Sequence, residues 1–220
     1  MRLLLTGTAP WVPTGYGSQI AALAPRLKAL GHDVALVATY GLYGGPIRWH
    51  GLTVYPGDHR RPVAEIIQGH AAHHQADAVI TIGDVFMTDP DDMAGLRWCP
   101  MFPVHGEPLS PLIQAPVRSA FQPLVYSDWA HRLCQDAGIE AVMLGHGVDT
   151  AIFQPGDRAT ARAVMGIPED HFLVVMVAFN RGDRKCLVDN LVGFQIFQQT
   201  YPDAELYLHT ADGSDGADAQ

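Results

Sequence analysis

Cysteine, positive charge and long apolar runs are all scarce in this chain of 220 residues. Its three cysteines (Cys99, Cys134 and Cys186) are an odd number without metal-ligand spacing, which fits a reducing compartment. Fourteen Lys and Arg against 23 Asp and Glu give a net charge of -9, which argues against a nucleic-acid-binding surface. No apolar run approaches membrane-spanning length, and the opening Met1–Leu5 run is too short for a signal peptide. We expect a cytoplasmic protein.

Strand and helix patterns alternate along the chain, which favours an α/β fold with a doubly wound parallel sheet. We expect strands at 2–6, 34–38, 47–49, 52–55, 78–82, 97–104, 124–126 and 140–144. We expect helices at 18–30, 63–74, 88–94, 111–120, 128–137 and 157–165. Gly166 and Pro168 end the last of these helices and suggest a domain boundary. The sequence therefore predicts a Rossmann-like first domain over residues 1–168.

A second strand-helix-strand unit follows over residues 169–210. Leu173–Val177 is an apolar run typical of a strand buried on both faces, and Leu187, Leu191, Phe194 and Phe197 recur at helical spacing. So short a segment cannot normally bury enough surface to fold alone, so we expect an incomplete second Rossmann-like domain, covered by an oligomer or partner. Residues 211–220 are rich in Gly, Asp and Ala, which predicts a disordered tail.

A basic turn lies between the strand and the helix of the second unit. Arg181, Arg184 and Lys185 stand at the carboxyl edge of the predicted strand, where α/β folds bind ligands. Cations at a helix N-terminus oppose the helix dipole by about 0.3–1 kcal/mol each, so three of them favour an anionic ligand such as phosphate. The alternative is a solvated helix start with paired charges.

The first strand is followed by a glycine-containing loop that offers a second anion site. Gly15, Tyr16 and Gly17 lie just before the expected first helix, where backbone amides attract anions. The spacing from Gly7 to Gly17 does not match the dinucleotide fingerprint, which makes a dinucleotide oxidoreductase the least favoured class. An ordinary surface turn remains the alternative.

His105 follows the strand that ends at Val104, at the edge where ligands gather, and is our candidate catalytic or substrate-contacting residue. Two further clusters favour structural roles. His70 and His74 share a helix face without a third metal ligand, and the aspartates from Asp89 to Asp92 suit capping better than metal binding. We therefore expect no metal site.

These pieces together resemble the GT-B glycosyltransferases, specifically the large retaining group known as glycosyltransferase family 1. The first domain opens as theirs does, with a strand, the Gly15–Gly17 motif, a helix and the run Leu30-Gly31-His32-Asp33-Val34. Tyr126-Ser127-Asp128-Trp129 and Leu144–Asp149 resemble the family's crossing between lobes. Arg184-Lys185 and Tyr201–Leu206 resemble the start of the nucleotide-sugar lobe. The match spans nearly the whole chain in the right order.

The resemblance implies transfer of a sugar from a nucleoside diphosphate sugar to an acceptor, with retention at the anomeric carbon and without metal or cofactor. Lys185, with Arg181 or Arg184, would bind the donor diphosphate, and Gly15 and Gly17 would approach the same phosphates. His105 would lie near the transferred sugar, while Tyr16 and the 40–49 loop would face the acceptor. The family's later acidic motif and nucleobase pocket would lie beyond residue 220, so we expect little turnover by the 220 residues alone.

Two other functions remain open at this point. A GT-B-like sugar-nucleotide epimerase shares the two-lobed architecture but yields an epimer without an acceptor. A non-catalytic binding or assembly subunit would lack a donor lobe or take one from a partner.

Overall fold

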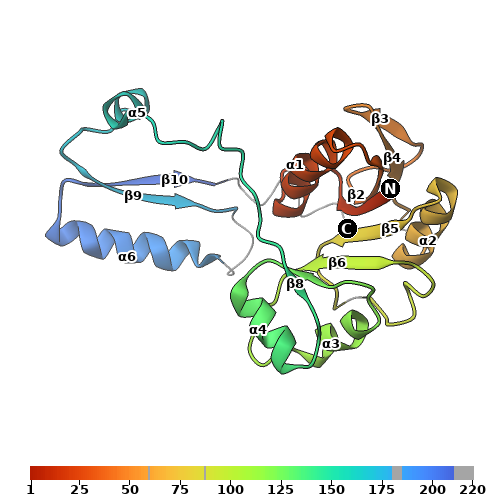
Figure 1. Cartoon of the computed structure of the whole chain (residues 1–220). Helices are drawn as coiled ribbons and strands as arrows, with labels where there is room; N and C mark the ends of the chain where they lie inside the picture. Colours follow the sequence, from red (N-terminus) through yellow and green to blue (C-terminus); the bar gives the residue numbers. More distant parts are fainter. Residues whose placement is uncertain (59, 87, 180–184, 211–220) are drawn as a thin grey trace. The chain divides into compact units, whose positions relative to one another are not determined.

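The computed structural model describes residues 1–58, 60–86, 88–179 and 185–210. Arg181, Arg184 and the expected disordered tail 211–220 lie outside these ranges. The chain divides into two compact units, Met1–Asp149 and Thr150–Gln220 (Figure 1).

The first unit holds an eight-stranded sheet with the order β3-β4-β2-β1-β5-β6-β7-β8. Its strands are β1 (Arg2–Thr8), β2 (Asp33–Tyr40), β3 (Ile47–Trp49), β4 (Leu52–Pro56), β5 (Ala78–Ile82), β6 (Trp98–Phe102), β7 (Leu124–Val125) and β8 (Val142–Met143). All neighbouring pairs are parallel except β3 with β4, which are antiparallel at one edge. The strand order reverses direction between β1 and β5, which is the point where doubly wound sheets bind ligands.

Helices cover both faces of this sheet, as Figure 1 shows. They are α1 (Gly15–Ala29), α2 (Val63–His74), α3 (Pro111–Arg118) and α4 (Asp128–Asp136). One core cluster joins side chains of α2, α3 and α4 to Leu4 and Val37 of the sheet. The other joins Ile20 and Ala24 of α1 to the opposite face. Alternating strand side chains thus supply both cores, which confirms the predicted α/β, doubly wound arrangement.

Local sequence explains where several helices begin. The side chain of Thr14 accepts a hydrogen bond from the Gly17 amide at 3.0 Å, so α1 begins at Gly15 rather than at the expected Ser18. Ser127 caps α4 in the same way by accepting from the Ala130 amide at 3.2 Å. The glycine motif is therefore the first turn of a helix, not a loop before it.

The helix expected at 88–94 is wrong, because the described residues of that segment form consecutive turns. The Asp92 amide donates to the Asp89 carbonyl, the Ala94 amide to the Asp91 carbonyl and the Leu96 amide to the Met93 carbonyl. The Asp92 carboxylate accepts from the Asp89 amide at 2.9 Å and so stabilises the first turn.

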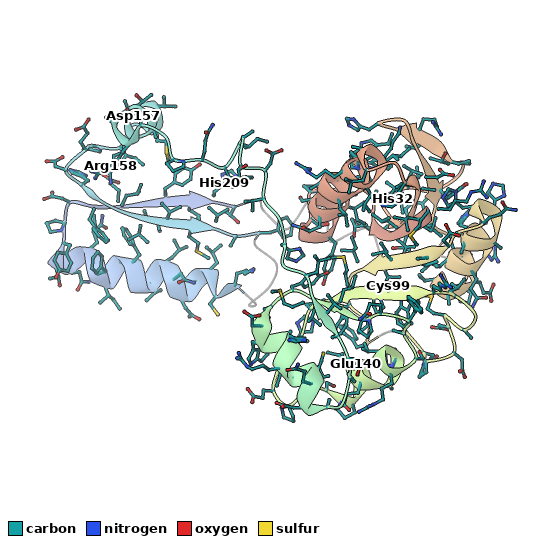
Figure 2. The ribbon with its side chains drawn as sticks, viewed as in Figure 1. His32, Cys99, Glu140, Asp157, Arg158 and His209 are labelled. Atoms are coloured by element: carbon teal, nitrogen blue, oxygen red, sulfur yellow. The ribbon has the colours of Figure 1, made fainter. Side chains whose placement is uncertain are left out.

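The second unit contains α5 (Arg158–Met165), β9 (Phe172–Val177), α6 (Leu187–Thr200) and β10 (Ala204–His209), with β9 and β10 parallel. Figure 2 shows Asp157 and Arg158 at the start of α5 and His209 at the end of β10. The unit begins at Thr150, earlier than the boundary expected after residue 168. Arg162 of α5 explains this, since its guanidinium donates to the carbonyls of Pro168 and His171 and ties the helix to β9.

Burial in β9 differs from the expectation of a strand covered on both faces. Its residues are exposed or half-buried, with Val175 at 54% and Val177 at 70% exposure. Among the described residues of the second unit only Arg162 and Ala204 are buried. The reason is that, within the described residues, β9 pairs only with β10, and Phe197 of α6 packs against Phe172 at its start, so the sheet is too narrow to bury it.

Candidate functional site

The carboxyl edge of the first sheet brings together residues that follow β1, β5, β6 and β7. Asp84 lies two residues after the end of β5, and His105 lies three residues after the end of β6, the strand beside it. Tyr16 lies in the first turn of α1, which follows β1. Because parallel strands end at one edge, residues far apart in the sequence meet here.

His105 is held by a carboxylate that the sequence analysis did not single out. Its Nε2 lies 2.8 Å from Asp84 Oδ1, and its ring meets Phe86 edge-on with centroids 6.4 Å apart. A carboxylate only accepts, so Nε2 carries the proton, and in the neutral ring Nδ1 is then the acceptor. The His105 side chain is 57% exposed and the Asp84 side chain 33%. The pair can thus offer an oriented imidazole to a ligand.

Tyr126, which is half-buried, follows β7 at the same edge of the sheet. Its hydroxyl donates to the Met101 carbonyl at 2.8 Å, and its ring stacks on His146 with centroids 3.9 Å apart. Burial raises the pKa of Tyr126 well above its ordinary value, with smaller contributions from Tyr16 and Asp84. Burial also lowers the pKa of His146, which favours a neutral ring at pH 7.

The three residues of the glycine motif differ in their surroundings. Gly15 is exposed, and a Cβ added there would meet nothing within 4 Å. Gly17 is buried, and a Cβ there would lie 2.4 Å from the Val12 carbonyl oxygen. Tyr16 is half-buried between them in the chain. Gly17 is thus required by the fold of its own loop, and Gly15 and Tyr16 are the members that a ligand can approach.

Two residues of the 144–149 segment contact other parts of the first unit. Asp149 does not begin a helix, since residues 150–152 form turns, and its Oδ2 lies 3.2 Å from Arg26 Nη2 of α1. His146, in the same glycine-flanked segment, stacks on Tyr126. The ion pair attaches the end of the first unit to the last turn of α1, and the ring stack attaches it to Tyr126 after β7.

Of the basic turn, Lys185 alone lies within the described residues. It is exposed and immediately precedes the αL residue Cys186 at the start of α6. Asn190 donates to the carbonyls of both Lys185 and Cys186, at 3.2 and 2.8 Å, so the helix start is held by a side chain. The candidate site residues fall in separate units: Gly15, Tyr16, Gly17 and His105 in the first, and Lys185 in the second.

Metal-ligating residues do not gather in the described parts of either unit: no group of three His, Cys, Asp or Glu side chains there could hold an ion. His70 stacks on Tyr55 instead, and His74 Nε2 lies 3.4 Å from the Asp33 carbonyl oxygen. Across residues 1–58, 60–86, 88–179 and 185–210, no helix has the length and apolarity needed to cross a bilayer.

No protein-family model matches the sequence, and no curated protein matches it. Solved structures do match, at low identity. The catalytic domain of starch synthase IV from Arabidopsis thaliana, bound to ADP and acarbose, aligns with a TM-score of 0.62 and 9% identity over 98% of this chain and 69% of that one. WaaG, a glycosyltransferase involved in lipopolysaccharide biosynthesis, aligns with a TM-score of 0.56 and 12% identity over 97% and 71%.

A third similar structure is the trehalose-6-phosphate protein from E. coli bound with UDP-2-fluoro glucose. It aligns with a TM-score of 0.57 and 11% identity over 97% of this chain and 66% of that one. The chain thus spans about two thirds of the length of these structures. Together with the strand order and the strand-helix-strand second unit, the alignments show that the chain forms part of a GT-B glycosyltransferase-like fold.

Proposed function

We propose that this protein is a retaining, metal-independent glycosyltransferase, whose first unit binds the acceptor and whose second unit belongs to the nucleotide-sugar domain. The observation that carries the proposal is the Asp84–His105 pair at 2.8 Å, at the ligand-binding edge of a GT-B-like first domain. The small and odd number of cysteines, three in 220 residues, supports a cytoplasmic location.

In this reaction the bond between the anomeric carbon and the diphosphate oxygen breaks, and a bond from that carbon to an acceptor hydroxyl oxygen forms. The hydroxyl proton passes to the departing diphosphate. Negative charge therefore grows on the phosphate oxygens, and cations that hold them stabilise the transition state. We assign this role to Lys185 together with Arg181 or Arg184. The amides of Gly15 and Tyr16 at the α1 N-terminus can add positive potential.

His105 is assigned to the transferred sugar rather than to the diphosphate. With Nε2 bonded to Asp84, its Nδ1 can accept a hydrogen bond from a sugar hydroxyl. Asp84 acts through His105 as a positioning residue, because the carboxylate fixes the ring's orientation and tautomer.

Binding measurements test these roles without requiring turnover. We expect His105→Ala to weaken binding of a nucleoside diphosphate sugar about 2- to 10-fold, as loss of one hydrogen bond does, and to leave the affinity for the nucleoside diphosphate unchanged. Lys185→Gln should weaken both ligands by about 10-fold or more, since it removes a charge-assisted contact. Lys28→Gln is the matched control, because Lys28 donates to the Gly51 carbonyl in the other unit. ADP, UDP and GDP with their glucose conjugates make up the ligand panel.

The proposal fails if none of these nucleotides binds, or if Lys185→Gln and Lys28→Gln bind them with the same affinity. Formation of an epimerised nucleotide sugar without an acceptor, detected by NMR, would show the epimerase instead. Nucleotide-independent assembly without any donor binding would show the non-catalytic subunit.

We also propose that further polypeptide covers the second unit. Exposed apolar side chains on β9 and α6 support this, among them Val177 at 70%, Val188 at 72% and Ile196 at 61% exposure. Light scattering of the purified chain should therefore report species larger than a monomer. A monomer at all concentrations would contradict this.

A further inference from the structure

A cavity of about 580 Å³ opens in the first unit between the end of β4, the preceding 43–46 loop and α2. Its size is that of a small-molecule site, which typically measures about 300–1,000 Å³. Glu65, Ile66, Gly69, His70 and His73 line it from one face of α2, as their helical spacing dictates. Every described residue that lines the cavity belongs to the first unit.

Aromatic rings form one wall of this cavity. Tyr55 stacks on His70 with centroids 4.5 Å apart and planes inclined by 13°, and His73 meets Tyr55 edge-on at 5.6 Å. Tyr43, 52% exposed, adds another ring from the loop. Burial is the main cause that lowers the pKa of His70, so this ring is neutral at pH 7. The wall is therefore an aromatic surface, which suits the apolar face of a flat ring.

The polar groups of the cavity come as neutralised pairs. Arg60 Nε lies 3.1 Å from Asp58 Oδ1, and Arg61 Nη2 lies 3.3 Å from Glu65 Oε2. Each guanidinium thus lies beside a carboxylate, so the cavity offers hydrogen-bond donors and acceptors next to one another. An anion would need donors alone and would be repelled by the carboxylates, whereas a hydroxyl both donates and accepts. The charges therefore favour a neutral polyhydroxylated ligand over a phosphate or carboxylate.

We propose that this cavity binds a neutral sugar ring, with its apolar face against Tyr43 and Tyr55 and its hydroxyls on the Arg61–Glu65 and Arg60–Asp58 pairs. In the transferase this sugar is part of the acceptor, a role that rests on the proposed function. The binding of the sugar itself does not rest on it.

The test is a titration of the full chain with maltotriose, a neutral chain of pyranose rings, followed by amide NMR. We expect saturable shifts of the Gly44, Gly57 and Gly69 amides, which lie around the cavity, with a dissociation constant of about 1 mM. Tyr43→Ala should weaken binding about fivefold or more through loss of the ring contact, and Tyr43→Phe should retain most of the affinity. Glu65→Gln should weaken it about 2- to 10-fold.

Arg132→Gln serves as the charge control, because Arg132 is an exposed arginine of α4, outside the cavity. Inorganic phosphate and glucose 6-phosphate form the anionic arm of the titration. The inference is overturned if maltotriose at about 10 mM shifts none of the three glycine amides. It is also overturned if Tyr43→Ala binds as the wild type does, or if phosphate binds more tightly than maltotriose.

The nucleotide titrations separate this inference from the proposed function. Maltotriose binding without nucleotide binding would preserve the sugar pocket and reject the transferase. Nucleotide binding without maltotriose binding would reject the pocket alone.

Discussion

Substituting Gly17 by alanine should destabilise the first unit because the loop before α1 leaves no room for a methyl group. The added Cβ would lie 2.4 Å from the Val12 carbonyl oxygen and 2.9 Å from the Ala9 carbonyl oxygen. Real Cβ atoms do not approach heavy atoms so closely, so the loop must move. Overpacking of this kind costs about 1–3 kcal/mol.

Movement of the loop also disturbs its backbone hydrogen bonds. The Ala9 amide donates to the Tyr40 carbonyl at 2.8 Å, and the Val12 amide donates to the Ala9 carbonyl at 3.0 Å. Loss of one such bond adds about 1 kcal/mol. The free energy of unfolding should therefore fall by about 2–4 kcal/mol in Gly17→Ala.

Gly15→Ala is the matched control from the same helical turn. Its added Cβ would meet nothing within 4 Å, and alanine is a better helix former than glycine by about 1 kcal/mol. We expect Gly15→Ala to be as stable as the wild type or up to about 1 kcal/mol more stable.

Urea unfolding followed by tryptophan fluorescence measures both variants. Trp11, Trp49, Trp98 and Trp129 are the four tryptophans of the chain and all lie in the first unit, so the signal reports that unit alone. Equal stabilities for Gly15→Ala and Gly17→Ala would refute the reasoning, because they would show that the loop tolerates the methyl group.

Three further predictions concern pH, local stability and a buried cation. Burial lowers the pKa of His70 from 6.5, so as the pH falls the unfolded chain binds the proton before the folded chain does, and the free energy of unfolding should fall below about pH 6.5. The urea midpoint of His70→Phe should therefore decrease less steeply with falling pH than that of the wild type. Equal decreases in the two proteins would contradict this. In a hydrogen-exchange experiment, the amides of β9 and β10 should exchange faster than those of β1, because few side chains described in the second unit are buried. Equal protection of the amides in these three strands would contradict this prediction. Arg162→Met should speed amide exchange in β9 further, because it removes the hydrogen bonds to the Pro168 and His171 carbonyls and lowers the local opening free energy by about 1–3 kcal/mol. Unchanged exchange rates in β9 would show that these bonds are dispensable.

Elements with strong local patterns were predictable from the sequence. The helix at 63–74 and the strand at 78–82 have the bounds expected, since apolar periodicity and flanking turn residues both act locally. The start of α1 was misplaced because two glycines suggested a loop, although Thr14 at the N-cap was a readable signal. At 88–94, Pro90 and the aspartates that compete for backbone bonds favour turns over a helix.

Burial and the site depend on contacts between distant segments. The apolar run of β9 looks like a buried strand in any sequence, but its burial is set by how many strands and helices surround it. Asp84 carries no local motif, and its contact with His105 follows from β5 and β6 being neighbours. The sequence predicted that His105 directly follows a strand ending at Val104, whereas β6 ends at Phe102 and His105 lies three residues further on, and its partner Asp84 could be found only from the strand order. The roles assigned to Arg181, Arg184 and Lys185 stay predictions.

Arg162 connects α5 to the segment before β9 through hydrogen bonds to the backbone carbonyls of Pro168 and His171. A guanidinium remains protonated over the whole pH range in which proteins fold, and backbone carbonyls do not titrate either. These two hydrogen bonds should therefore hold α5 to the segment before β9 equally well in acid and in base.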